Sequence, residues 1–146
     1  MKIAMVSEHA SPPATLGGVD AGGQNVHVAA LARALAAAGH EVEVYTRRHD
    51  PALPDAVVMA PGVSVLQVPA GPPRPIPKED LLPYMADFGR WLARRWTSEG
   101  APDVVHAHFW TIQTLHLIAI HALCAAVDEH LAGLRPAEVL RAQVTA

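Results

Sequence analysis

The chain has 146 residues, with 11 Lys and Arg against 14 Asp and Glu, which gives a formal net charge of −3. This length predicts a single domain, and the negative charge argues against a nucleic-acid-binding module, whose contacts with phosphates need a basic surface. Hydrophobic residues make up 51% of the chain and charged residues 17%, which excludes a disordered protein. The single cysteine, Cys124, cannot form an internal disulfide and fits a cytoplasmic location.

The first part of the chain predicts a strand, a loop, a helix and a second strand. Residues 2–7 (KIAMVS) are a short apolar run typical of a buried strand, and the prolines and glycines of residues 8–21 predict a loop. Apolar residues spaced three and four apart predict a helix that opens at Gly22 and Gly23 and is capped by Gly39. The alternation in residues 41–46 (EVEVYT) favours a strand near a sheet edge. Such a βαβ unit makes the two strands parallel.

The rest of the chain continues this alternation. Residues 63–68 predict a third strand, residues 69–77 a loop rich in proline, and residues 78–98 a helix whose regular part starts near Pro83. One face of that helix is expected to carry Leu81, Leu82, Met85, Phe88, Trp91, Leu92 and Trp96. Residues 103–106 predict a fourth strand, and residues 111–131 and 136–144 two more helices. The fold class expected is therefore α/β, a Rossmann-like three-layer sandwich around a mainly parallel sheet. No targeting or transmembrane segment is expected.

The most informative motif is the glycine-rich segment at residues 17–28 (GGVDAGGQNVHV), at the opening of the first helix. A helix N-terminus presents free N–H groups and a partial positive charge, which suits a phosphate or a sugar oxygen. The alternative interpretation is that these glycines only form a tight turn. The presence of four glycines within seven residues makes that interpretation less favourable. The segment is neither a GxGxxG fingerprint nor a P-loop, which argues against nicotinamide enzymes and P-loop NTPases.

A second candidate site lies at residues 106–110 (HAHFW), at the end of the fourth strand. His106 and His108 are two residues apart, so both are expected on the same side of a strand. The two histidines have three possible roles: a pair of metal ligands, packing in the core, or polar contacts in a ligand crevice. We predict no metal, because no third ligand follows at a persuasive spacing.

Charged residues give weaker signals. Lys78 could meet an anionic ligand, although a solvated charge in the first helical turn is the simpler interpretation. Arg94 and Arg95 are expected on a solvated helix face, whereas Arg47 and Arg48 follow the second strand at the edge where ligands bind.

Four segments in order, residues 17–28, 31–45 (LARALAAAGHEVEVY), 68–81 (VPAGPPRPIPKEDL) and 103–110 (DVVHAHFW), resemble the N-terminal half of retaining GT-B glycosyltransferases of family 4. The most similar branch contains sucrose synthases, sucrose-phosphate synthases and inositol-phosphate N-acetylglucosaminyltransferases. The resemblance implies two Rossmann-like domains facing across a cleft, the first holding a sugar or sugar-phosphate acceptor and the second a nucleotide-sugar donor. It implies transfer with retention of configuration, and no metal or other cofactor.

The same resemblance implies roles for particular residues. His108 matches a histidine near the transferred sugar and is the expected catalytic residue. Gly22 and Gly23 are expected against the donor diphosphate or the acceptor, and Asn25 is expected to bond to the acceptor. Lys78 matches a lysine that contacts the phosphate of phosphorylated acceptors.

The domain organisation expected from the sequence is an acceptor-side domain at residues 1–110, an incomplete half of a GT-B fold, and an atypical helical tail at residues 111–146. We expect a truncated, frameshifted or rearranged gene product with little transfer activity by itself, which the downstream DNA sequence would test. The alternatives are a non-catalytic module that binds a sugar phosphate and an interaction protein that self-associates. The chain could also require a separately encoded C-terminal half.

Overall fold

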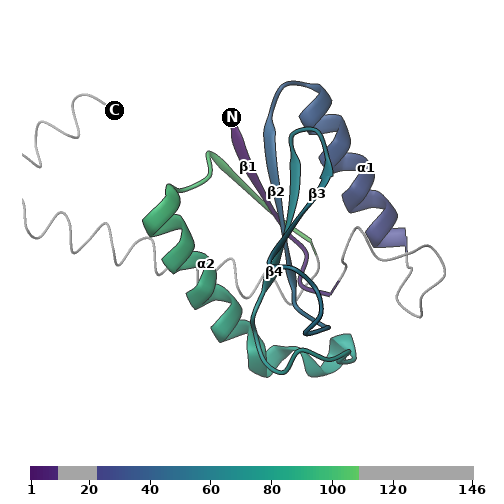
Figure 1. Ribbon diagram of the computed structural model, residues 1–146, viewed down its shortest axis with the longest axis vertical. Coiled ribbons are helices and arrows are strands. Elements are labelled where there is room, and N and C mark those ends of the chain that lie inside the picture. The colour runs from purple at the N-terminus through teal and green to yellow at the C-terminus, as the bar shows by residue number, and fades with distance from the viewer. Residues whose placement is uncertain (10–22, 109–146) are drawn as a thin grey trace, which may run out of the picture.

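The computed structural model describes residues 1–9 and 23–108, which form a sheet between two α-helices (Figure 1). The strands are β1 (Lys2–Val6), β2 (Glu41–Arg47), β3 (Ala56–Ala60), β4 (Val63–Val68) and β5 (Val104–Ala107). The α-helices are α1 (Gly23–Ala37) and α2 (Met85–Glu99), and the 3-10 turns η1 (Lys78–Asp80) and η2 (Leu82–Tyr84) precede α2. The strand order within these residues is β3-β4-β2-β1-β5, with only β3 antiparallel to its neighbour. The predicted strand–helix alternation and mainly parallel sheet are confirmed.

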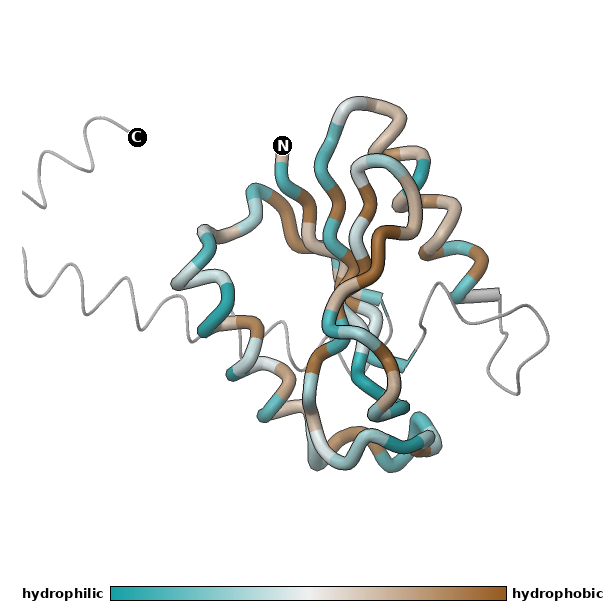
Figure 2. Tube along the Cα trace, in the orientation of Figure 1, coloured by the Kyte–Doolittle hydropathy of each residue, from teal (hydrophilic) through white to brown (hydrophobic). Residues whose placement is uncertain are grey.

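Alternating side chains on the strands build one core on each face of the sheet. On β1, Ile3 and Met5 pack with Val28 of α1, whereas Ala4 and Val6 belong to the cluster that contains Phe88 of α2. Figure 2 shows the most hydrophobic stretches of the chain concentrated in the strands between the helices. The three-layer arrangement expected from the sequence is therefore confirmed.

The end of α1 shows the cap that Gly39 predicts. Gly39 has a φ of +88°, its N–H donates to the Ala36 carbonyl at 2.9 Å, and the His40 N–H donates to the Leu35 carbonyl at 3.2 Å. These are the two bonds of a Schellman motif, in which glycine adopts the left-handed conformation at little cost. The chain can therefore turn directly from α1 into β2.

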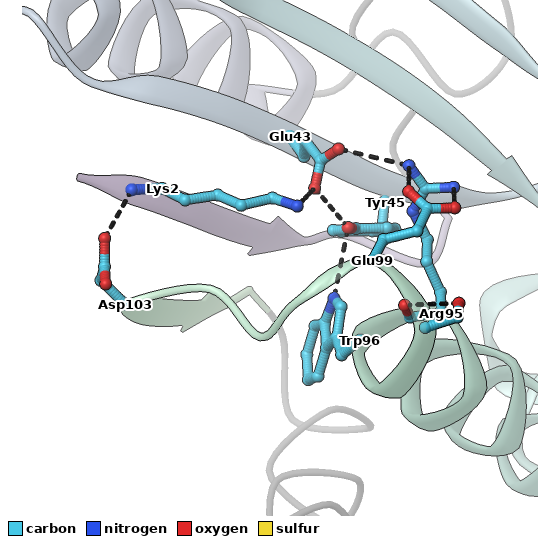
Figure 3. A network of polar contacts seen from close by, with 8 residues as sticks. Lys2, Glu43, Tyr45, Arg95, Trp96, Glu99 and Asp103 are labelled. Atoms are coloured by element: carbon cyan, nitrogen blue, oxygen red, sulfur yellow. Dashed lines mark hydrogen bonds and ion pairs between the residues drawn. The ribbon is translucent and has the colours of Figure 1, made fainter.

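The position predicted for β2, near a sheet edge, is wrong: β2 lies between β4 and β1. Glu43 is tolerated there because it accepts a hydrogen bond from the Tyr45 hydroxyl at 2.6 Å and lies 3.2 Å from Lys2 Nζ and 3.3 Å from Arg95 Nη2 (Figure 3). The Tyr45 hydroxyl in turn accepts a hydrogen bond from Trp96 Nε1 at 3.2 Å. The alternation of charged residues and valines in β2 therefore does not indicate a sheet edge. It reflects a central strand whose Glu43 carboxylate forms ion pairs on the face covered by α2.

This network also corrects the prediction that Arg94 and Arg95 are both solvated. Arg94 is exposed, but Arg95 is half-buried and also pairs with Glu99 at 2.7 Å. Burial opposes ionisation of Glu43, but hydrogen bonds from Tyr45 and Lys2 and the charges of Lys2 and Arg95 outweigh it and lower the pKa of the carboxyl.

Three further features differ from the sequence-based prediction. Strand β3 was not predicted; it is a short edge strand with little burial, in which Val58 is 75% exposed. The α-helical part of the second helix begins at Met85, two residues after Pro83. Leu82 was expected on the apolar face but is exposed.

The helices predicted at residues 111–131 and 136–144 lie outside the described residues, and no helix of the described part is long and apolar enough to cross a membrane.

Candidate functional site

The candidate site lies where the parallel strands end. β1 and β5 are neighbours, and the His108 N–H continues their pairing by donating to the Val6 carbonyl at 2.9 Å. The residues after β1, including the buried Ser7 and Glu8, therefore lie beside the end of β5. Helix α1 begins at the same edge of the sheet (Figure 1), which is where ligands bind in open α/β folds.

Three histidines meet at this edge. The ring centroid of His108 is 4.4 Å from that of His106 and 5.8 Å from that of His27, with interplanar angles of 74° and 72°. His106 and His108 thus face the same side, as their spacing predicts. His27 comes from α1, four residues after the helix begins, so the start of α1 and the end of β5 lie on one rim of the sheet.

His108 has the most perturbed environment of the three. The residue is 8% exposed, and its Nε2 atom is buried without a hydrogen-bond partner among the described residues. Burial, and to a lesser extent His106 and His27, lower the pKa of His108 to about 4, against an opposing effect of Glu8. The ring is therefore neutral at physiological pH, and a neutral imidazole offers one donor and one acceptor nitrogen to a ligand hydroxyl.

Glu8, His9 and His27 are candidate site residues that the sequence analysis missed. Glu8 is 1% exposed, and its Oε1 atom lies 3.7 Å from His9 Nδ1. The Glu8 carbonyl accepts a hydrogen bond from the Arg47 N–H at 2.9 Å, which fixes the chain just after β1. The signal that could have found Glu8 and His9 was their position immediately after the first predicted strand.

The residues implied by the resemblance come from three segments. Gly22 lies outside the described residues, Gly23 is the first residue of α1, and Asn25 is 8% exposed in the first turn of that helix. Lys78 begins η1; its side chain is 54% exposed, and Nζ lies 3.8 Å from Glu79 Oε1. Figure 1 places the connection from β4 to α2, which carries Lys78, beyond the same edge of the sheet.

The rim offers imidazoles, a buried carboxylate and helix amides, which are groups that bind hydroxyls and phosphates. Within residues 1–9 and 23–108, no group of three or more His, Cys, Asp or Glu side chains has a geometry that could hold a metal ion. Hydrogen bonding to an oxygen-rich ligand is therefore the chemistry that the described part of the site supports.

Comparisons with known proteins identify the family to which this domain belongs. The sequence matches Glycosyltransferase Family 4 over residues 21–127, so the chain belongs to this family.

Individual relatives extend the comparison. The chain is 47% identical over 111 residues to a D-inositol 3-phosphate glycosyltransferase of Xylanimonas cellulosilytica, covering 75% of this chain and 27% of the relative. It is 43% identical over 111 residues to the protein of the same name from Streptomyces coelicolor, covering 75% of this chain and 24% of the relative. The chain thus spans about a quarter of the length of these curated relatives.

A solved structure shows the same fold. The sucrose-phosphate synthase from Thermosynechococcus elongatus superposes with a TM-score of 0.77 and 32% sequence identity, over 82% of this chain and 30% of that one. The expected fold, part of a GT-B glycosyltransferase, is confirmed.

Proposed function

We propose that residues 1–110 form the acceptor-binding part of a retaining glycosyltransferase that uses a nucleotide-sugar donor, and that the acceptor is a phosphorylated cyclitol or sugar. The observation that carries the proposal is the contact of His27 with His108 and of His108 with His106 on the rim where α1 begins. Relatives named for D-inositol 3-phosphate support this acceptor class. The single cysteine of the chain supports a cytoplasmic location as part of the proposal.

In this proposal each part of the rim has a separate role. The neutral His108 ring bonds to a hydroxyl near the transferred sugar, and Asn25 bonds to the acceptor. The N-terminus of α1 at Gly23 binds a phosphate, either of the acceptor or of the donor diphosphate, because a helix N-terminus stabilises negative charge; the proposal assigns the same ligand to Gly22. Lys78 supplies an ammonium group to the acceptor phosphate.

Acceptor binding and transfer are separable in this proposal. Glycosyl transfer requires two substrates held together and a stabilised departing diphosphate, which the proposal assigns to a donor-binding half. We therefore expect the 146-residue chain by itself to bind acceptor but to transfer little or no sugar.

The test is calorimetric titration of the full chain with D-inositol 3-phosphate, with unphosphorylated inositol and with UDP-glucose. The proposal expects the phosphorylated cyclitol to bind more tightly than inositol, and Lys78→Ala to remove most of that preference. Arg90→Ala is the matched control, since Arg90 is an exposed cation on α2. Equal binding of both cyclitols, or binding of neither, would contradict the proposed acceptor, and efficient sugar transfer by this chain would contradict the assignment of transfer to a second half.

A further inference from the structure

Arg47 is a buried cation at the carboxyl end of β2, only 4% exposed. Its Nη1 atom donates to the carbonyls of Arg48 at 3.0 Å and Pro72 at 2.9 Å, and its Nη2 atom donates to the carbonyl of Arg74 at 2.6 Å. Burial lowers the pKa of Arg47, an effect that Tyr84 opposes. A buried guanidinium is costly unless its donors are paired, and here carbonyl oxygens accept three hydrogen bonds from it.

The carbonyls of Pro72 and Arg74 belong to the segment 69–77, which joins β4 to η1 and contains five prolines. Proline has no N–H, so this segment has few donors of its own with which to fix its shape. Its described backbone bonds include those from Ala70 N–H to the Val68 carbonyl at 2.9 Å and from Arg74 N–H to the Pro72 carbonyl at 2.8 Å. The planar fork of Arg47 therefore supplies bonds that cross from the sheet to the segment.

Packing also fixes the same segment, at Gly71. Gly71 has a φ of +72°, and a Cβ atom placed there would lie 2.4 Å from Cδ1 of Tyr84. Further on, Leu81 is 1% exposed and anchors the turn that begins at Lys78. Contacts with Arg47 and Tyr84 thus hold the segment 69–77, and the burial of Leu81 holds the turn that follows it. Lys78 lies in the sequence between the segment and Leu81.

We infer that Arg47 is a positioning residue that sets the preference for a phosphorylated acceptor by holding the segment 69–77 so that the Lys78 ammonium meets the phosphate. This inference rests on the proposed function, because it assigns the phosphate to Lys78. Arg47 does not touch the acceptor in this account and acts through the segment alone. Lysine cannot replace it, since a single ammonium nitrogen lacks the planar fork whose two nitrogens reach the carbonyls of Pro72 and Arg74.

The test measures the ratio of dissociation constants for inositol and D-inositol 3-phosphate in the wild-type chain, Arg47→Lys, Lys78→Ala and the double variant. We expect Arg47→Lys to lower the ratio by about tenfold while the affinity for inositol stays within about twofold, because charge and volume are nearly kept. In the Lys78→Ala background the same substitution should change the ratio little, which is the coupling expected of residues that act as a unit. Parallel loss of both ligands, or additive effects, would show a purely structural role and overturn the inference.

A second measurement separates this inference from the proposed function. Amide hydrogen exchange in Arg47→Lys should become faster across residues 74–81 and stay unchanged in α2, with Arg90→Lys as the control. If exchange becomes faster in Arg47→Lys but the wild-type chain binds no cyclitol, the proposed acceptor is wrong. The role of Arg47 in positioning the segment would still stand. Unchanged exchange at residues 74–81 would overturn the positioning role, whatever the chain binds.

Discussion

The imidazole of His27 lies 5.8 Å from that of His108, with the rings inclined at 72°, so the first turns of α1 touch the end of β5. These segments are far apart in the sequence and meet because β1 and β5 are neighbours in the sheet. The contact brings the start of α1, at Gly23, to the segment that contains both histidines of the HAH motif. The candidate site depends on this single junction.

The pH dependence of stability should report the burial of His108. Its pKa is about 4 in the folded chain and about 6.5 when unfolded, so between these values the unfolded state binds the extra proton. The stability contribution of the neutral ring is complete above pH 6.5 and is lost as the pH falls towards 4, by up to about 3 kcal/mol at roughly 1.4 kcal/mol per pKa unit. Urea unfolding between pH 7.5 and 4.5 measures this slope.

The matched variants are His108→Gln and His40→Gln, because His40 lies at the opposite end of α1 from the cluster. The first should flatten the pH dependence and the second should keep it. A steep loss of stability that persists in His108→Gln would mean that other groups, such as His106, His27 or Glu8, are its cause.

Removing Glu43 should destabilise the fold much more than removing Glu99. Both carboxylates pair with Arg95, but Glu43 has a side chain 12% exposed and also binds Lys2 and Tyr45. Loss of one partner from such a buried network costs about 3 kcal/mol, whereas an exposed helix pair contributes about 0.5 kcal/mol. Chemical denaturation of Glu43→Ala and Glu99→Ala measures the difference, and equal effects would refute a structural role for the network.

Gly71→Ala should be more harmful than Gly100→Ala, although both glycines have positive φ values, +72° and +93°. Each substitution places a side chain on a backbone with positive φ, which costs on the order of 1–3 kcal/mol. Only at position 71 would the new methyl group also collide with the Tyr84 ring, whereas position 100 has nothing within 4 Å. Overpacking adds about 1–3 kcal/mol. Thermal melts should therefore rank wild type above Gly100→Ala and Gly100→Ala above Gly71→Ala; the reverse order would exclude close packing of the segment 69–77 against Tyr84.

Local patterns predicted most of the fold because the strands and α1 are regular. The apolar run of β1, the helical spacing of α1 and Gly39 each depend on neighbours in the chain, and all three were found as expected. The central position of β2 was not predictable in this way, because Glu43 is neutralised by Lys2 and Arg95 from distant elements. Strand β3 was missed because its apolar run (AVVMA) lacks the alternation of a half-buried strand, although the structure leaves its side chains partly or fully exposed.

The candidate site was partly predictable for the same reason. The pairing of His106 with His108 follows from strand geometry, and the rim follows from parallel topology. The participation of His27 depends on how α1 packs against the sheet, which no local motif contains. The role of Arg47 was likewise not predictable from the sequence, because its hydrogen bonds to the carbonyls of the segment 69–77 appear only in the structure.

The most direct test of the account follows the imidazole resonances of the nine histidines while D-inositol 3-phosphate is added to the full chain. The account predicts that the signals of His27, His106 and His108 and the amide of Asn25 shift with one common dissociation constant, while the signal of His40, just beyond the far end of α1, stays in place. If the cyclitol phosphate binds and the three rings do not respond, the rim at the start of α1 is not the acceptor site.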